Sequence, residues 1–189
     1  MSGMDVLLVG SGGREHAIAI GLSDSESVSG LHCTPGNAGT SIVSLNHEVL
    51  VSDIEGIVEL AKKLRVSLVV VGPEAPLVSG LANRLREEEI PCFGPNSEGA
   101  LLEGSKLHAK KIMASLDVPT GQFAVVRDLR SIETSLDLFE PPWVIKRDIL
   151  AGGKGVIVTS SRDEALDALS EWIECDGFVL IEEYLTGEE

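Results

Sequence analysis

The sequence has 189 residues, of which 43% are hydrophobic and 24% charged, and its formal net charge is −15. This length and composition fit one large domain or two small ones with a buried core, and they exclude a disordered chain. A chain this acidic repels a phosphate backbone at long range, so we expect no nucleic-acid partner. An anionic ligand would need local backbone N–H groups and a few well-placed cations.

The cysteines and the N-terminus indicate the cellular compartment in which the protein is expected. Cys33, Cys92 and Cys175 lie far apart, a pattern that predicts free thiols in a reducing compartment rather than a disulfide framework or a zinc site. No basic segment precedes the first apolar run, and that run is short because Gly10 breaks it. We therefore predict neither a signal peptide nor a membrane-spanning helix, and we expect a cytoplasmic protein with no membrane partner.

The first half of the sequence alternates short aliphatic runs with longer segments of helical period. The predicted strands are 6–9, 31–33, 68–71 and 91–94, and the predicted helices are 14–22, 54–64 and 77–88. Continuous apolar strands separated by helices predict an α/β domain whose parallel sheet is covered on both faces. Each predicted strand leads into a loop rich in glycine or proline, and such loops line the ligand crevice of an open α/β sheet.

After about residue 104 the pattern changes. Helices are predicted at 105–116, 129–138 and 162–173, and strands at 122–126, 143–146, 155–158 and 178–181. Two of these strands are separated only by residues 147–154 and predict a hairpin, so this half is predicted to be α+β. We divide the chain into domains at 1–104 and 105–189. The sequence stops directly after a strand and a turn, so we expect a fragment.

The segment GSGGREH, residues 10–16, follows the first strand and opens the first helix. Its glycines allow a tight turn, and the helix N-terminus offers unpaired N–H groups, so a phosphate is the natural ligand. A dinucleotide fingerprint would require glycine at position 15, where Glu15 stands, and the second strand lacks the acidic residue that holds a ribose. A tight turn without any ligand is the alternative to a phosphate site.

Two later loops are predicted to converge on the same edge of the sheet. The first, PGNAGT at 35–40, supplies Gly39 and the amide of Asn37, and the second, GPEAPLV at 72–78, supplies the carboxylate of Glu74. Together with the first glycine-rich loop, this set suits a sugar phosphate that carries hydroxyl groups and an amine.

The second half places lysines where a nucleotide would need them. Lys106 opens a predicted helix, Lys146 ends a predicted strand, and Lys154 lies in the glycine-rich segment AGGKG at 151–155. A strand-end lysine followed by a glycine-rich hairpin lays backbone N–H groups and an ammonium group over a triphosphate. This is not a Walker loop, because Gly155 follows Lys154 and a strand comes next. For each lysine alone, an ordinary surface charge is the alternative.

Six blocks of the sequence occur in the order and spacing of one family. They are LLVGSGGREHAIA, TPGNAGT, VVGPEAPLV, FGPNSEGALLEGSK, VIKRDILAGGKGVIV and IEEYLTGEE. The sequence resembles the N-terminal part of glycinamide ribonucleotide synthetases, the phosphoribosylamine–glycine ligases of de novo purine biosynthesis. The resemblance covers essentially the whole chain. It implies a Rossmann-like domain that precedes the ATP-grasp part, followed by an α+β ATP-grasp lid subdomain.

The resemblance also implies ligand-binding residues. In the first half it implies a phosphate at Gly12 and Gly13 and the amino-sugar near Glu74, whereas His16 is expected to be a packed helix residue. In the second half, Glu182 would face the exocyclic amine of adenine, although a solvated charge pair with Glu183 is the alternative. The implied ATP-binding residues are Lys106, Lys146, Gly153, Lys154, Glu182, Glu183, Leu185 and Glu188, with Val144 and Ile181 as apolar walls.

The family's reaction joins glycine to phosphoribosylamine through an acyl phosphate, with cleavage of ATP to ADP and phosphate. The Mg²⁺ ligands of ATP-grasp enzymes lie after the adenine-binding hinge, so we expect no metal ligand in this chain, assign no catalytic residue, and expect the chain alone to be inactive. Another ATP-grasp carboxylate ligase, similar to biotin carboxylase or to a phosphoribosyl carboxylase, is one alternative. A non-enzymatic nucleotide- or sugar-phosphate-binding module is the other. Arg147 and Ile149 replace residues that are usually small in the family, and their effect on the lid is open.

Overall fold

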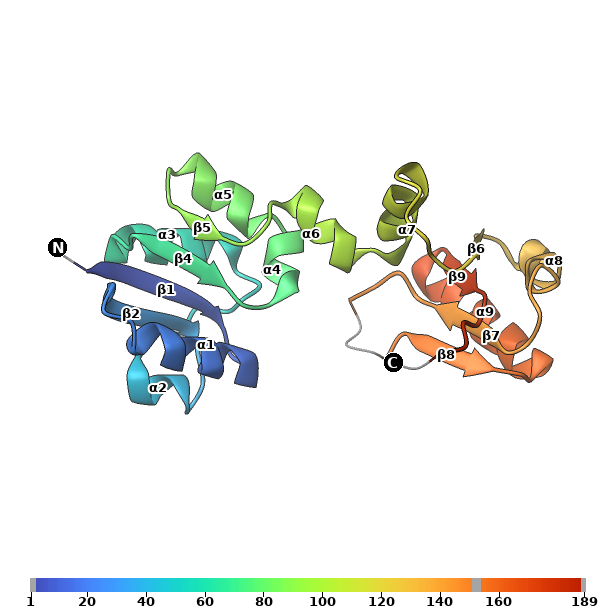
Figure 1. Ribbon diagram of the computed structural model, residues 1–189, viewed down its shortest axis with the longest axis horizontal. Coiled ribbons are helices and arrows are strands. Elements are labelled where there is room, and N and C mark those ends of the chain that lie inside the picture. The colour runs from blue at the N-terminus through green and yellow to red at the C-terminus, as the bar shows by residue number, and fades with distance from the viewer. Residues whose placement is uncertain (1–2, 151–153, 188–189) are drawn as a thin grey trace. The chain divides into compact units, whose positions relative to one another are not determined.

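The computed structural model describes residues 3–150 and 154–187. The chain forms two compact units, Met1–Leu101 (unit 1) and Leu102–Glu189 (unit 2), each with its own sheet (Figure 1). Two of the predicted ATP-binding residues, Gly153 and Glu188, lie outside the described residues. None of the helices within 3–150 and 154–187 combines the length and the apolar character that crossing a membrane requires.

Unit 1 is built on a five-stranded parallel sheet with the strand order β3-β2-β1-β4-β5. The strands are β1 (Met4–Gly10), β2 (Val28–Pro35), β3 (Leu45–Asn46), β4 (Leu68–Val71) and β5 (Cys92–Phe93). The central strand β1 carries four consecutive apolar residues, 6–9, and all four are fully buried. A strand can bury consecutive side chains only when both faces of its sheet are covered.

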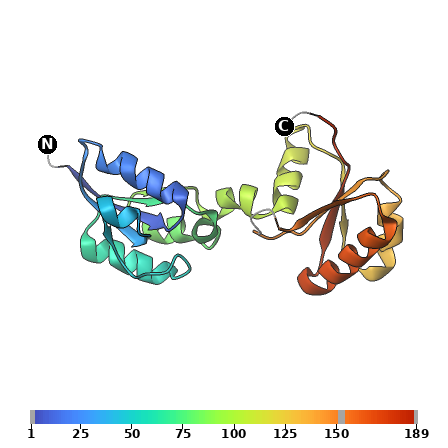
Figure 2. The same cartoon turned by 90° about the horizontal axis from the view of Figure 1, so that it is seen from below.

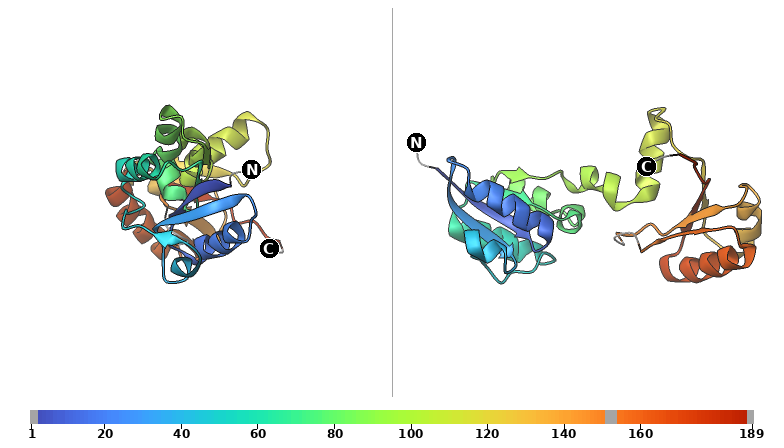
Figure 3. Two further views of the ribbon diagram at one scale, coloured as in Figure 1. Left: turned by 90° about the vertical axis from the view of Figure 1, so that its left-hand side faces the viewer. Right: turned by 60° about the horizontal axis from the view of Figure 1, so that its bottom comes forward.

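Helices cover both faces of this sheet (Figures 1 and 3). On one face, Ala19 of α1 (Gly13–Ser23) packs with Val6 and Leu8, and α2 (Thr40–Val43) adds its last residue. On the other face, Leu7 and Val9 pack against α3 (Ile54–Leu64), α4 (Glu74–Val78) and α5 (Leu81–Glu87). The predicted parallel α/β architecture is confirmed.

Two details of unit 1 differ from the sequence prediction. The single helix predicted over 77–88 is broken at Gly80, whose φ of +92° lies in the left-handed region and ends α4 before α5 begins. The helix α6 (Ser97–Gly104) was not predicted at all, and neither were α2 and the two-residue strand β3. These elements are short or rich in glycine and polar residues, so they carry little hydrophobic period.

Unit 2 is built on a four-stranded antiparallel sheet with the order β6-β9-β7-β8. The strands are β6 (Phe123–Val126), β7 (Trp143–Lys146), β8 (Val156–Thr159) and β9 (Val179–Glu182). The helices are α7 (Lys106–Ser115), α8 (Ile132–Leu136) and α9 (Arg162–Asp176), and a 3₁₀ turn (Leu129–Ser131) precedes α8. The predicted hairpin between β7 and β8 is confirmed, and a bond from the Arg147 N–H to the Gly155 carbonyl at 2.9 Å extends it.

The two faces of the unit 2 sheet have different roles. Figure 2 shows α8 and α9 packed on one face of this sheet. Ile145 of β7 and Ile181 of β9 are fully buried in the core between these helices and the sheet. Because side chains alternate along a strand, the next residues, Lys146 and Glu182, lie on the opposite face. Ile181 therefore packs against α9 and is no wall of a nucleotide pocket, contrary to the expectation from the sequence.

Candidate functional site

In unit 1 the glycine-rich loop between β1 and α1 is organised by the carboxylate of Glu15. The residue is only 4% exposed, and its Oε2 accepts the N–H of Gly12 at 2.7 Å, so an N3 carboxylate bonds back to the N-cap backbone at the start of α1. The Glu15 side chain leaves no room for a side chain at Gly10 or Gly72, because a β-carbon at either position would collide with it. Glu15 therefore fixes the shape of this loop from within.

The second loop of unit 1 is tied to the first through Asn37. Its side-chain Nδ2 donates to the carbonyl oxygens of Ser11 at 2.9 Å and Gly12 at 3.1 Å, while its Oδ1 accepts the N–H of Gly39 at 2.7 Å. The ring of His16 lies so close to Gly39 that a β-carbon there would overlap it. The structure thus brings the predicted residues together, but it gives the Asn37 amide a scaffolding role within the loops.

The third loop carries Glu74, which begins α4 at the end of β4. Its Oε2 lies 3.6 Å from a terminal nitrogen of Arg14, whose Nε donates to Glu15 at 3.1 Å. The hydrogen bond to Glu15, with Glu74 beyond it, raises the pKa of the Arg14 guanidinium. Gly12 and Gly13 are exposed beside this arginine. The edge of the sheet therefore presents one guanidinium between two carboxylates, next to an exposed glycine turn and the first N–H groups of a helix.

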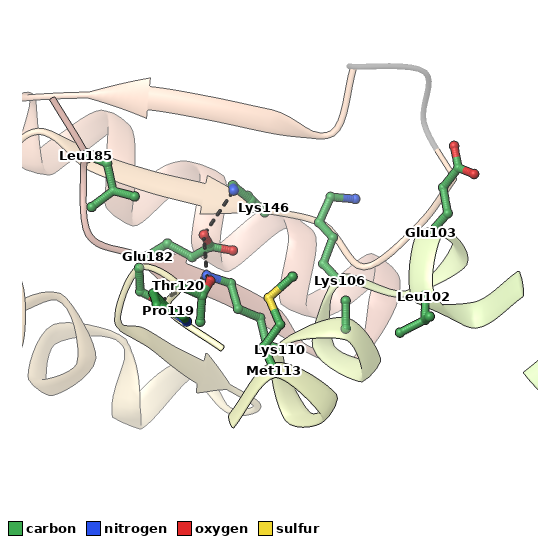
Figure 4. A pocket seen from close by; sticks show the side chains of 12 residues that line it. Leu102, Glu103, Lys106, Lys110, Met113, Pro119, Thr120, Lys146, Glu182 and Leu185 are labelled. Carbon is green, nitrogen blue, oxygen red and sulfur yellow. Dashed lines mark hydrogen bonds and ion pairs between the residues drawn. The ribbon is translucent and has the colours of Figure 1, made fainter. Parts of the chain in front are cut away.

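Unit 2 contains a cavity of about 450 Å³ on the face of its sheet that does not contact α9 (Figure 4). Three lysines and two glutamates line it together with apolar and small residues. The lining residues are Leu102, Glu103, Lys106, Ala109, Lys110, Met113, Pro119, Thr120, Gly121, Lys146, Glu182 and Leu185. Cavities of this volume accommodate cofactors and drug-sized ligands.

The charged centre of this cavity is the carboxylate of Glu182, which is 6% exposed at the end of β9. Its Oε2 lies 3.0 Å from the ammonium nitrogen of Lys146 and 3.0 Å from that of Lys110 (Figure 4). A buried carboxylate is tolerated only when it is paired, and here two cations hold the same oxygen. One negative and two positive charges leave this cluster with a formal charge of +1.

The remaining predicted residues of unit 2 are distributed unevenly. Lys106 lines the cavity, and its Nζ donates to the carbonyl of Ile149 at 3.1 Å. Leu185 lines it too, whereas Glu183 uses its N–H and its Oε1 to pair with the backbone of Gln122, at 3.0 and 2.8 Å. Lys154 is exposed in the hairpin turn and is not among the described residues that line the cavity.

The base of the β7–β8 hairpin is fixed on both sides of the sheet. Arg147 forms a bidentate ion pair with Asp176 at the end of α9, with N–O distances of 2.6 and 2.7 Å, and its guanidinium lies over the ring of Trp172. Asp148, one residue on, accepts the hydroxyl of Ser105 at 2.8 Å and the N–H of Leu107 at 3.2 Å, at the start of α7. Arg147 thus faces away from the cavity.

Sequence reasoning missed three residues of these sites: Glu15, Lys110 and Asp148. Lys110 had a detectable signal, because it follows Lys106 by four residues and so shares a face of α7 with it. Glu15 was noted only as a residue that breaks the dinucleotide fingerprint. In the part of the chain that the structure describes, no three His, Cys, Asp or Glu side chains are grouped so that they could hold a metal ion.

The comparisons with known proteins agree with this geometry. Residues 104–189 match the family model described as phosphoribosylglycinamide synthetase, ATP-grasp (A) domain, so unit 2 is of the ATP-grasp class. Residues 4–103 match the model of the N domain of the same synthetase. The chain therefore belongs to the phosphoribosylglycinamide synthetase family, which confirms the resemblance noted in the sequence.

Individual relatives support this assignment. The chain is 45% identical to a phosphoribosylamine–glycine ligase of Mycobacterium leprae over 191 residues, which cover 98% of this chain and 45% of that protein. It is 46% identical to the Streptomyces coelicolor ligase over 186 residues, covering 98% and 44% of the two chains. The chain thus spans less than half the length of these relatives.

Solved structures show the same fold. The crystal structure of the Thermotoga maritima phosphoribosylamine–glycine ligase superposes with a TM-score of 0.74 at 34% identity and covers 97% of this chain and 44% of its own. The N5-carboxyaminoimidazole synthetase of Staphylococcus aureus, solved with ADP, gives a TM-score of 0.78 at 16% identity over 98% and 48% of the two chains. At that identity the second likeness concerns the fold alone.

Proposed function

We propose that this chain provides the sugar-phosphate and ATP-binding parts of a phosphoribosylamine–glycine ligase. The reaction forms glycinamide ribonucleotide from glycine, phosphoribosylamine and ATP. A carboxylate oxygen of glycine attacks the γ-phosphorus and ADP leaves, and the amine of phosphoribosylamine then displaces phosphate from the acyl phosphate. Membership of the family and the charge of the unit 2 cavity support this proposal. The cytoplasm stays the predicted location.

The observation that carries the proposal is the concentration of lysines in one cavity of a strongly acidic protein. Lys106, Lys110 and Lys146 face Glu103 and Glu182 there, so three positive and two negative charges leave a formal charge of +1, whereas the whole chain carries −15. A cavity that reverses the sign of its protein selects an anionic ligand. Positioning and neutralisation of a triphosphate are what phosphoryl transfer requires of a protein.

Figure 4 shows which side chains lie at each end of the cavity. Leu185 and Pro119 lie toward one end, and Lys106, Glu103 and Leu102 lie toward the other. We place the adenine at the end with Leu185 and Pro119, beside Glu182, and the phosphates toward Lys106 and Lys146. Because the N–H of Glu183 is donated to Gln122, a contact from the Glu183 backbone to adenine has to use its carbonyl oxygen.

Mg²⁺ does not fit the described part of this cavity. The cation prefers carboxylate and water oxygens in an octahedral arrangement. Of the two carboxylates that line the cavity, Glu182 is already shared by two ammonium groups, which repel a further cation, and Glu103 stands alone as a ligand. We therefore derive no step through the metal, and metal ligands beyond residue 189 stay a prediction.

For unit 1 we propose that the edge formed by the three loops binds the phosphoribosylamine. The exposed turn at Gly12 and Gly13 and the Arg14 guanidinium would hold the phosphate, and Glu74 would face the amine. The N–H of Gly12 is already donated to Glu15, so the phosphate has to be held by the neighbouring donors. In this proposal residues 1–104 bind the sugar phosphate, and 105–189 begin the ATP-binding part.

Titration calorimetry of the 189-residue chain tests both halves of the proposal. We expect ATP and glycinamide ribonucleotide each to bind at one site, and we expect binding of ATP to weaken steeply with salt because charge neutralisation dominates it. NAD serves as the competing ligand. Binding of NAD in place of the ribonucleotide would refute the sugar-phosphate site, and failure of ATP to bind would refute the nucleotide cavity.

A further inference from the structure

Lys110 is the buried cation of the unit 2 cavity. It lies on α7 and is 8% exposed. Its Nζ donates to Thr120 Oγ1 at 2.8 Å and to the Gly121 carbonyl at 3.0 Å, and it contacts Glu182 Oε2 at 3.0 Å. Of the three hydrogens of this ammonium group, two are donated to Thr120 and Gly121, and the group also forms the ion pair with Glu182. Lys110 therefore binds mainly protein groups, although it lines the cavity.

Lys146 has a different position beside the same carboxylate. Its Nζ contacts the same oxygen of Glu182 at 3.0 Å, and its side chain is 27% exposed where that of Lys110 is 10% exposed. Figure 4 shows the two ammonium groups on opposite sides of the carboxylate. Since Lys110 already neutralises Glu182, the charge of Lys146 remains uncompensated and faces the cavity.

We infer that Lys110 is a positioning residue for the nucleotide phosphates, acting through Glu182 and never touching the ligand. It neutralises and orients the carboxylate, so that Lys146 is held by one contact but keeps a net positive charge for the polyphosphate. It also ties Glu182 at the end of β9 to the loop at 119–121. This inference rests on the proposed ATP site.

A role confined to packing makes a different prediction. If Lys110 only stabilised unit 2, its loss would lower the affinities for AMP, ADP and ATP by the same factor. If it acts through charge, its loss leaves Lys146 and Glu182 as a neutral pair, and the loss of affinity grows with the number of phosphates. If it contacted the phosphates directly, the variant that lacks both Lys110 and the Glu182 charge would bind tripolyphosphate more weakly than the parent, although both carry the same formal charge.

The experiment measures the affinities of AMP, ADP, ATP and inorganic tripolyphosphate for four forms of the chain by calorimetry. The forms are the parent, Lys110→Gln, Glu182→Gln and the double variant. We expect Lys110→Gln to weaken ATP and tripolyphosphate about tenfold and AMP less than threefold. The double variant restores the formal charge of +1, so its tripolyphosphate affinity, on which no adenine contact of Glu182 bears, is expected within about threefold of the parent. Lys111→Gln, at the exposed neighbouring position, is the matched control and is expected to change nothing.

Each outcome decides the inference. A uniform loss for all the nucleotides, or a double variant that binds tripolyphosphate as poorly as Lys110→Gln, overturns it. Should Lys110→Gln not fold, the double variant is compared with the parent, and a tripolyphosphate affinity more than threefold below that of the parent overturns it. A parent chain that binds tripolyphosphate but not ATP refutes the proposed ATP site alone. A parent that binds neither refutes both.

Discussion

The two units contrast in the materials from which their proposed anion sites are built. Unit 1 uses backbone: an exposed glycine turn, the N-terminus of α1 and a single arginine that Glu15 and Glu74 flank. Unit 2 uses side chains: three lysines line its cavity, and two of them pair with the buried carboxylate of Glu182. A backbone site depends on shape and fails when a β-carbon intrudes, whereas a side-chain site depends on charge and fails when a cation is removed. The same acidic chain thus offers one site sensitive to volume and one sensitive to charge.

The largest effect is expected from Gly10→Ala, which changes the shape of the glycine-rich loop in unit 1. Gly10 has a φ of +136°, and a β-carbon there would meet the Glu15 side chain, so we expect unit 1 to lose roughly 3 kcal/mol of stability. Alkylation of the buried Cys33 during urea unfolding, read by peptide mass spectrometry, measures this loss. Gly13→Ala is the control, because a β-carbon at Gly13 meets open space. Equal stability of the two variants would show that Glu15 does not shape the loop.

Lys146→Met removes a positive charge from the unit 2 cavity and is expected to have the next largest effect. It removes the cation that faces the cavity, so we expect ATP affinity to fall about 30-fold, in line with the roughly 2 kcal/mol that a charged hydrogen bond contributes. Glycinamide ribonucleotide affinity is expected to stay unchanged. Calorimetry measures both, with Lys111→Met as the control of equal charge change. An equal loss of affinity for both ligands would show that the two ligands do not bind at separate sites.

A smaller effect is expected from acid on the Arg147–Asp176 pair. The guanidinium holds the pKa of Asp176 below its ordinary value, so the pair stabilises unit 2 above about pH 4 and this stabilisation is lost as pH falls through the lowered pKa. Trp143 and Trp172 are the only tryptophans and both belong to unit 2, so their fluorescence follows this unit alone. The urea midpoints of the parent and Asp176→Asn are expected to differ at neutral pH and to converge below about pH 4. A constant difference would assign the effect to packing.

The smallest effect is expected in unit 1 at milder pH. Nδ1 of His32 and Nε2 of His47 lie 3.0 Å apart, and burial, followed by the charges of His32 and Lys63, lowers the pKa of His47. A lowered pKa in the folded state means that stability is complete above the ordinary histidine pKa of about 6.5 and declines as pH falls below it. Cys33 protection is therefore expected to weaken between about pH 6.5 and 5 while tryptophan fluorescence is unchanged. His47→Gln should abolish the decline, and a decline that persists would exclude His47 as its cause.

The sequence predicted the sheets better than the helices between them. Continuous apolar runs such as 6–9 and 68–71 are buried strands because no amphipathic helix would tolerate them, and the structure confirms them. The helix predicted over 77–88 failed at Gly80, since a hydrophobic period does not reveal that a glycine adopts a left-handed φ. Whether a glycine continues or ends a helix is decided by packing that the local sequence does not contain.

For the sites, the sequence indicated which loops meet but not which side chains hold them. Parallel strands direct their carboxyl ends to one edge, so the convergence of the glycine-rich loops in unit 1 was predictable. The bonds from Asn37 to Ser11 and Gly12 were not, because they join residues 25 or more positions apart. The role of Lys110 is not visible in the sequence, because a lysine in this setting suggests a phosphate ligand, whereas this one binds protein groups.

The alternation along β7 sets a rule for how this chain can change in evolution or in the laboratory. Neighbouring residues Lys146 and Arg147 serve opposite faces, one toward the cavity and one toward α9. Inserting or deleting a single residue in β7 would exchange them, sending the guanidinium into the unit 2 cavity and the lysine to Asp176. Length changes in this strand are therefore tolerable only in pairs. Alignments of relatives should show no gap of odd length in β7.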